Sequence, residues 1–245
     1  MSKVASERTA IVVGVGSSNG LGSALARRFA HEGLKVVIVG RTKERLEAVA
    51  ADIGGRRRGV TAFAGDASKE SDIAALFKTV KPASLELVVY NVGNNAMVPS
   101  LDITKALFER MWRQNALGGF LVGREAIRTM LPQGKGSLIY TGATASVRAR
   151  PPFLAFASAK AALRAVAQGF AREFGPQGIH VAHVVIDGVI HGDYAQSKFP
   201  KFVAAKGDDG LLELDDIAQT YWTLHNQPRS AWTHELDLRP FREQF

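Results

Sequence analysis

A glycine turn between an apolar strand and an amphipathic helix, within residues 9–30, constrains the fold of this chain more than any other feature. β-Branched and apolar residues fill positions 9–15, as in a strand buried on both faces, and apolar residues recur at helical spacing at Leu21, Leu25 and Phe29. Glycines lack Cβ, so the backbone between the two elements can turn sharply and approach a diphosphate, which the helix N-terminus also favours. A plain strand-to-helix turn is the alternative. The predicted dinucleotide contacts here are Gly16, Ser18, Asn19, Gly20, Leu21 and Gly22.

Strand and helix patterns alternate along the rest of the chain. This alternation predicts an α/β fold with one parallel sheet of seven strands, covered by helices on both faces, in a single domain over residues 1–245. The predicted strands are 9–15, 35–40, 59–63, 85–90, 137–141, 180–186 and 235–238, and the predicted helices are 21–31, 43–53, 70–79, 105–130, 157–174 and 217–224.

Composition excludes several classes of protein. The 245 residues contain no cysteine, so disulfides, thiolate metal sites and cysteine nucleophiles are excluded, and we predict no metal site. We find no apolar run long enough to span a bilayer and no signal peptide in residues 1–7, and we therefore expect a cytoplasmic protein without a membrane partner.

The net charge of +8 favours anionic partners. The basic run Arg56-Arg57-Arg58 lies between a helix and a strand pattern and has no interleaved aromatic residues of the kind that stack on bases. A phosphate-rich cofactor or substrate therefore explains the charge with fewer assumptions than nucleic-acid binding.

Residues 190–214 lose clear periodicity and carry scattered glycine and proline residues. So long a stretch without regular structure in a compact domain is typical of a functional lid, and we predict a substrate lid at about 190–214. A disordered surface insertion is the alternative.

Arg41 stands at the end of the second predicted strand, about 20 residues after the glycine turn, where an acidic residue would bind the adenosine ribose hydroxyls. A guanidinium pairs with a 2′-phosphate but offers no acceptor to a free hydroxyl. We therefore predict NADP(H) rather than NAD(H) as the cofactor, with Lys43 as a further source of positive charge.

The spacing Gly-x-x-x-Gly-x-Gly at 16–22 resembles the short-chain dehydrogenase/reductase family, and further matches follow in that family's order over nearly the whole chain. Asp66 resembles its adenine-contacting aspartate, and Asn91-Val92-Gly93 resembles its Asn-Ala-Gly turn beside the cofactor. Asn115 resembles the active-site asparagine that holds a water in a proton relay. The resemblance implies a Rossmann-type, doubly wound oxidoreductase.

The catalytic part of the family pattern is incomplete. Lys160 matches the lysine of Tyr-x-x-x-Lys, but Phe156 stands at the tyrosine position and Ala143 at the serine position. In the family, the tyrosine donates a proton and the lysine also binds the nicotinamide ribose, so only the second role is kept. Gly188 and Ile190 follow the sixth strand where the family binds the carboxamide. The catalytic positions are Asn115, Lys160, Phe156 and Ala143.

Other groups are candidates for the missing acid. They are the hydroxyls of Thr141, Thr144, Ser146 and Tyr194, and an acid–base pair of Asp187 and His191. A hydroxyl in a loop is more often a turn former than a catalyst.

Three functions stay open. The first is a divergent NADPH-dependent reductase of a carbonyl or of a conjugated double bond, the latter with an acyl-CoA as a candidate substrate because some thioester reductases of the family lack the tyrosine. The second is a non-catalytic NADP(H)-binding redox sensor or pseudoenzyme, and the third, least favoured, is nucleic-acid binding. The resemblance also implies a homodimer or homotetramer, and small or apolar positions that suit close helix packing are Ala157, Ala161, Ala165 and Phe170.

Overall fold

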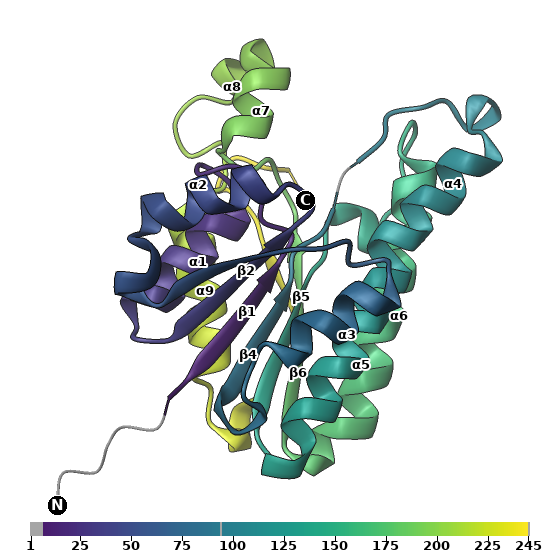
Figure 1. The fold of residues 1–245 in the computed structure, drawn as a ribbon. Coiled ribbons are helices and arrows are strands. Elements are labelled where there is room, and N and C mark those ends of the chain that lie inside the picture. Colours follow the sequence, from purple (N-terminus) through teal and green to yellow (C-terminus); the bar gives the residue numbers. More distant parts are fainter. Residues whose placement is uncertain (1–6, 94, 245) are drawn as a thin grey trace, which may run out of the picture.

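A seven-stranded parallel sheet runs through the computed structural model, which describes residues 7–93 and 95–244 (Figure 1). The strand order is β3-β2-β1-β4-β5-β6-β7, and every neighbouring pair is parallel. The predicted fold class is therefore confirmed. The strands are β1 (Thr9–Val13), β2 (Lys35–Gly40), β3 (Val60–Ala64), β4 (Leu85–Tyr90), β5 (Gly136–Thr141), β6 (Ile179–Ile186) and β7 (Glu235–Leu238).

Helices cover both faces of this sheet. Successive residues of a strand point to opposite faces and pack into two separate hydrophobic cores. Ala10 and Val12 of β1 pack with α1, α2 and α9, whereas Ile11 and Val13 pack with α3, α5 and α6. The helices are α1 (Leu21–His31), α2 (Lys43–Ile53), α3 (Glu70–Lys78), α4 (Lys105–Trp112), α5 (Gly118–Met130), α6 (Leu154–Phe174), α7 (Asp193–Lys198), α8 (Pro200–Lys206) and α9 (Leu214–His225).

The structure corrects the predicted helix over 105–130. This segment consists of α4 and α5, joined by a π-helical turn at Arg113–Leu117. The Tyr90 hydroxyl donates a 2.5 Å hydrogen bond to the carbonyl of Gln114, which helps to satisfy the backbone of the widened turn. The turn therefore lies directly beside the end of β4.

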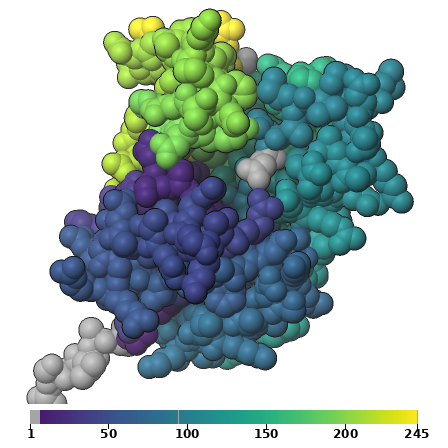
Figure 2. Space-filling model, turned by 45° about the horizontal axis from the view of Figure 1, so that its top comes forward, coloured from purple at the N-terminus to yellow at the C-terminus, as the bar shows by residue number. Residues whose placement is uncertain are grey.

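The predicted lid contains more regular structure than the sequence indicates. Residues 190–214 hold the two short helices α7 and α8, so the expectation of an irregular stretch is wrong. In Figure 2, where α7 and α8 are green, they form a projection above the purple glycine turn.

Element ends differ in a few further places. Strand β1 ends at Val13 because the amides of Gly14 and Val15 both donate to the carbonyl of Val39, so the turn starts two residues earlier than predicted. Helices α6 and α9 each start three residues earlier, at Leu154 and Leu214. The prediction about a signal peptide concerns residues 1–7, of which residues 1–6 lie outside the described residues. None of the helices in the described ranges is long and apolar enough to cross a membrane.

Candidate functional site

A cavity of about 1060 Å³ opens at the carboxyl ends of the strands, between the glycine turn, the lid and the start of α6. The sheet order places the reversal of strand order between β1 and β4, where such folds bind ligands. Most of the predicted site residues meet here. Those that line the cavity are Gly16, Asn19, Gly20, Leu21, Gly22, Arg41, Asp66, Asn91, Gly93, Ala143, Phe156, Lys160, Gly188 and Ile190.

The glycine turn presents open backbone to the cavity. A Cβ placed on Gly16 would meet no atom within 4 Å, whereas one on Gly22 would lie 2.8 Å from the carbonyl oxygen of Gly14. Gly16 thus leaves room for a ligand, and Gly22 lets α1 pack closely on the turn. Ser18 is not among the lining residues: its carbonyl accepts from Arg27 Nη1 at 2.8 Å, and Ser17 lines the cavity in its place.

Positive charge gathers where β2 ends. Arg41 and Arg45 both line the cavity there, whereas Lys43 lies 3.8 Å from Glu47 and is not a lining residue. Arg45 was not among the predicted site residues, although an arginine in the first turn of the helix that follows Arg41 is a usable signal. Burial raises the pKa of Asp66, but hydrogen bonds from the amide and hydroxyl of Ser68 outweigh burial and, with the charge of Arg41, lower that pKa.

Lys160 lies buried on the floor of the cavity. Its Nζ donates to the carbonyls of Thr141 at 2.8 Å and Val92 at 3.1 Å, and it lies 5.8 Å from the ring centroid of Phe156. Burial lowers the pKa of Lys160 from 10.5 to about 7. The ammonium is therefore held at the ends of β4 and β5 by backbone oxygens, with a phenyl ring where the family has a phenol.

Asn115 lies in the π turn and is fully buried, so it does not line the cavity itself. Its Nδ2 donates to the carbonyl of Met111 at 2.9 Å, and its Oδ1 has no hydrogen-bond partner among the residues that the structure describes. A Cβ on Gly93 would lie 3.7 Å from that Oδ1. The amide oxygen is thus an unused acceptor directly behind the cavity wall.

Three of the four candidate hydroxyls are engaged elsewhere. Thr141 Oγ1 lies 2.8 Å from the hydroxyl of Tyr221 in the core, Thr144 Oγ1 donates to Asp187, and Ser146 Oγ accepts from the amide of Ala143 at 3.0 Å. Of the four residues, Thr141 and Tyr194 line the cavity, but the Thr141 hydroxyl is the one bound to Tyr221. The Tyr194 hydroxyl donates to Asn95 Oδ1 at 3.0 Å and so connects α7 with the loop after β4.

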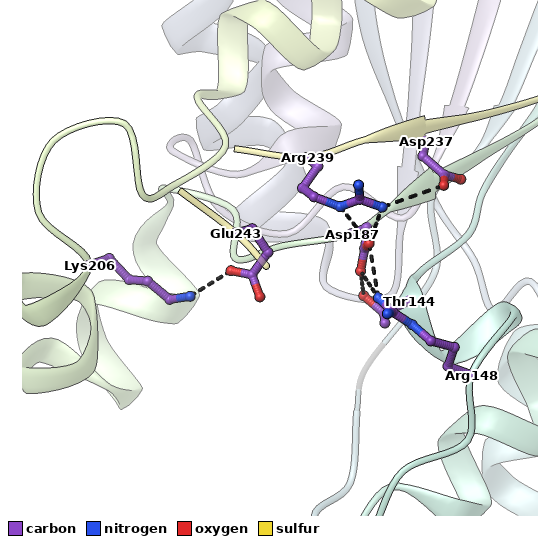
Figure 3. A network of polar contacts seen from close by, with 7 residues as sticks. All are labelled: Thr144, Arg148, Asp187, Lys206, Asp237, Arg239 and Glu243. Atoms are coloured by element: carbon purple, nitrogen blue, oxygen red, sulfur yellow. Dashed lines mark hydrogen bonds and ion pairs between the residues drawn. The ribbon is translucent and has the colours of Figure 1, made fainter. Parts of the chain in front are cut away.

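Asp187 does not pair with His191, so the predicted acid–base pair is absent. The Asp187 carboxylate is buried and accepts from Thr144 at 2.5 Å, from Arg148 at 3.0 Å and from Arg239 at 2.7 Å, as Figure 3 shows. His191 Nδ1 lies 2.8 Å from Glu213 Oε1.

The electrostatic balance at Asp187 favours its charged form. Burial raises its pKa, but the hydrogen bonds from Thr144 and Arg239 and the charges of Arg148 and Arg239 outweigh burial and lower it. The carboxylate therefore links three segments: the loop after β5, the end of β6 that Asp187 follows, and the chain after β7.

Comparison with known proteins agrees with this geometry. The family model described as short chain dehydrogenase matches residues 8–201. A glucose 1-dehydrogenase of Gluconobacter oxydans is 33% identical over 186 residues, which are 73% of this chain and 69% of that protein. An uncharacterized oxidoreductase of Staphylococcus aureus is 26% identical over 242 residues, 97% of this chain and 99% of the relative.

Solved structures show the same fold. A short-chain dehydrogenase from Rhodopseudomonas palustris matches with a TM-score of 0.79 and 36% identity over 95% of this chain and 99% of that one. An actinorhodin polyketide ketoreductase solved with NADPH matches with a TM-score of 0.86 over 98% of each chain at 19% identity, a likeness of fold alone.

Proposed function

This chain belongs to the short-chain dehydrogenase family, and we propose that it is an NADP(H)-dependent oxidoreductase that reduces a conjugated double bond or a carbonyl without a tyrosine acid. One observation carries the proposal: a single cavity joins the open glycine turn to the buried Lys160 ammonium. NADPH, when bound, supplies the hydride. The protein supplies binding, orientation and charge.

The residues of the cavity fit a phosphorylated dinucleotide. Gly16 leaves space for the diphosphate beside the N-terminus of α1, and Arg41 with Arg45 provides guanidinium groups for a 2′-phosphate. In its protonated form Lys160 has three N–H donors, of which two serve backbone carbonyls, so one donor is available for a ribose hydroxyl. These fits support NADP(H) over NAD(H).

The replaced catalytic residues favour hydride addition to the β-carbon of a conjugated double bond over hydride addition to a carbonyl carbon. Neither Phe156 nor Ala143 has a proton to donate to an alkoxide, and the hydroxyls of Thr141, Thr144 and Ser146 are engaged in other hydrogen bonds. Loss of a general acid typically costs about 10²–10⁴ in rate. A conjugated double bond avoids the need for an acid at this position, because its proton is added elsewhere on the substrate. An acyl-CoA is one such substrate.

The same replacements support a second candidate function, a redox sensor that binds NADP(H) without turnover. We also propose a homodimer or homotetramer. Of the four predicted packing positions, Ala161 and Ala165 are exposed on α6 and Phe170 is half-buried, whereas Ala157 is buried within this chain.

Titration with NADPH and NADH tests the cofactor first. We expect NADPH to bind more tightly, and Arg41→Ala to remove most of that preference, whereas Arg57→Ala, an exposed arginine outside the cavity, leaves it unchanged. Consumption of NADPH is then followed with enoyl thioesters, quinones and ketones. Selective binding with turnover supports the reductase, selective binding without turnover supports the sensor, and no binding contradicts both.

A further inference from the structure

Aromatic side chains gather at the end of the cavity beyond Lys160. They come from the start of α6 and from the lid, and Met97 of the loop after β4 adds a further apolar side chain. Four of the lining side chains are between 39% and 56% exposed although they are large and apolar. The apolar residues of this group, called here the aromatic end, are Met97, Phe153, Phe156, Tyr194, Phe199 and Phe202.

Contacts between these segments hold the aromatic end together. The amide of Val98 donates to the carbonyl of Pro152 at 3.0 Å, which places the loop after β4 beside the start of α6. Tyr194 reaches from α7 to Asn95 at 3.0 Å, and its ring meets that of Phe199 edge-on at 6.3 Å between centroids. Three walls thus surround the space in front of Phe156.

Charge is distributed unequally along the cavity. Arg41, Arg45 and Asp66 lie where β2 and β3 end, at the opposite end from Phe156. Asp193 lies beside the glycine turn, where its amide donates to the carbonyl of Asn19 at 2.9 Å. The acidic and basic groups at the aromatic end are already partnered or negative: Lys160 is bound to backbone oxygens, and Asp193 precedes Tyr194 in α7. Outside the lining, Lys206 Nζ lies 5.2 Å from the ring centroid of Phe202 and is paired with Glu243 at 2.6 Å.

We propose that the aromatic end binds a flat, uncharged, conjugated group of the substrate, stacked between Phe156 and the lid side chains Phe199 and Phe202. This inference rests on the proposed function, because it names the substrate class of the same cavity. Aromatic rings prefer offset or edge-on neighbours, which these residues offer on two sides of a planar molecule. A carboxylate in the same place would lose its hydration without gaining a free cationic partner, so a charged analogue is disfavoured.

Binding of two matched probes tests the proposal. The neutral enone 4-phenyl-3-buten-2-one and cinnamate share a phenyl ring and a conjugated double bond, but only cinnamate is charged. Each is titrated calorimetrically into the full-length protein, with and without saturating NADPH. We expect the enone to bind at least about ten-fold more tightly than cinnamate. Equal or tighter binding of cinnamate would overturn the proposal.

Variants locate the binding. Phe199→Ala and Phe202→Ala are each expected to weaken binding of the enone by about five- to ten-fold. The matched control is Phe120→Ala, because Phe120 is 38% exposed, against 39% for Phe199, and lies on α5 outside the cavity. An unchanged enone affinity in both lid variants contradicts the proposal.

The NADPH dissociation constant of every variant is measured in parallel. It distinguishes failure of the proposed function from failure of the proposed substrate class. If NADPH fails to bind, the proposed function is wrong, and the enone titration of the cofactor-free protein still decides the substrate class. If NADPH binds and the enone does not, only the substrate class is wrong.

Discussion

Gly93 leaves the space that the Lys160 ammonium occupies: a Cβ at position 93 would lie 2.9 Å from Nζ and 3.2 Å from Cε. Gly93→Ala is therefore expected to displace Lys160 from the cavity floor and to raise the NADPH dissociation constant about ten-fold. Gly169→Ala is the matched control, because a Cβ there meets no atom within 4 Å and the residue lies within α6. The control should keep NADPH binding and gain about 0.5–1 kcal/mol of stability. Equal NADPH affinity in both variants would contradict the role of Gly93.

The buried Lys160 predicts a pH dependence of stability. Its pKa is about 7 in the folded protein, against 10.5 for an ordinary lysine, so the unfolded chain binds the extra proton between these values. The unfolding free energy of the wild type should therefore rise with pH from 7 to 10 by about 3–5 kcal/mol relative to Lys160→Met, which does not titrate. Urea unfolding of both proteins without cofactor, at several pH values, measures the difference. If the unfolding free energies of the two proteins change in parallel with pH, the pKa of Lys160 is not lowered in the folded protein.

Asp187 is expected to stabilise the three segments that it joins. Its side chain is 6% exposed and binds two arginines, so Asp187→Asn should cost about 3 kcal/mol at neutral pH. Because the folded pKa lies below the ordinary value of 3.8, this stability is present above pH 4 and is lost as the pH falls through the folded pKa. Asp237→Asn is the control, since Asp237 is 46% exposed and 3.7 Å from Arg239, and should cost under about 1 kcal/mol.

Restoring the family residues tests whether the site keeps its geometry. Phe156→Tyr with Ala143→Ser places a phenol near Lys160, which lies 5.8 Å from the Phe156 ring centroid. We expect ketone reduction to increase by about 10² or more, with a smaller gain for either single variant. Steady-state rates on small ketones measure the gain. A double variant that binds NADPH but reduces ketones no faster would show that the pocket has been reshaped around Phe156.

Local patterns in the sequence predicted most of the sheet and its flanking helices. The elements β2, α2, β4 and β7 and helix α1 have the predicted bounds, because each is a short apolar or amphipathic run between clear turn residues. The glycine-turn end of the cavity was predictable for the same reason, since Gly16 and Arg41 come shortly after the ends of β1 and β2. Such features depend on neighbours within a few residues.

Features that depend on distant partners were not predictable. Asp187 is hydrogen-bonded to residues 39–52 positions away, and Tyr194 to a residue 99 positions away, so neither arrangement leaves a local pattern. The π turn around Asn115 depends on the Tyr90 hydroxyl from another strand. The helices α7 and α8 span only 6 and 7 residues, too few for a periodic signal.

The lid is also fastened to the last part of the described chain. Lys206 of α8 binds Glu243 at 2.6 Å, and the amide of Arg242 donates to the carbonyl of Asp209 at 3.2 Å (Figure 3 shows the first contact). A label attached at residues 242–244 is therefore placed against the lid and would alter the behaviour that it was meant to report. The first residue of the interior strand β1, Thr9, lies at the amino ends of the strands and so at the opposite end of the sheet from the cavity and the lid, so a label on this side leaves the lid contacts untouched (Figure 1).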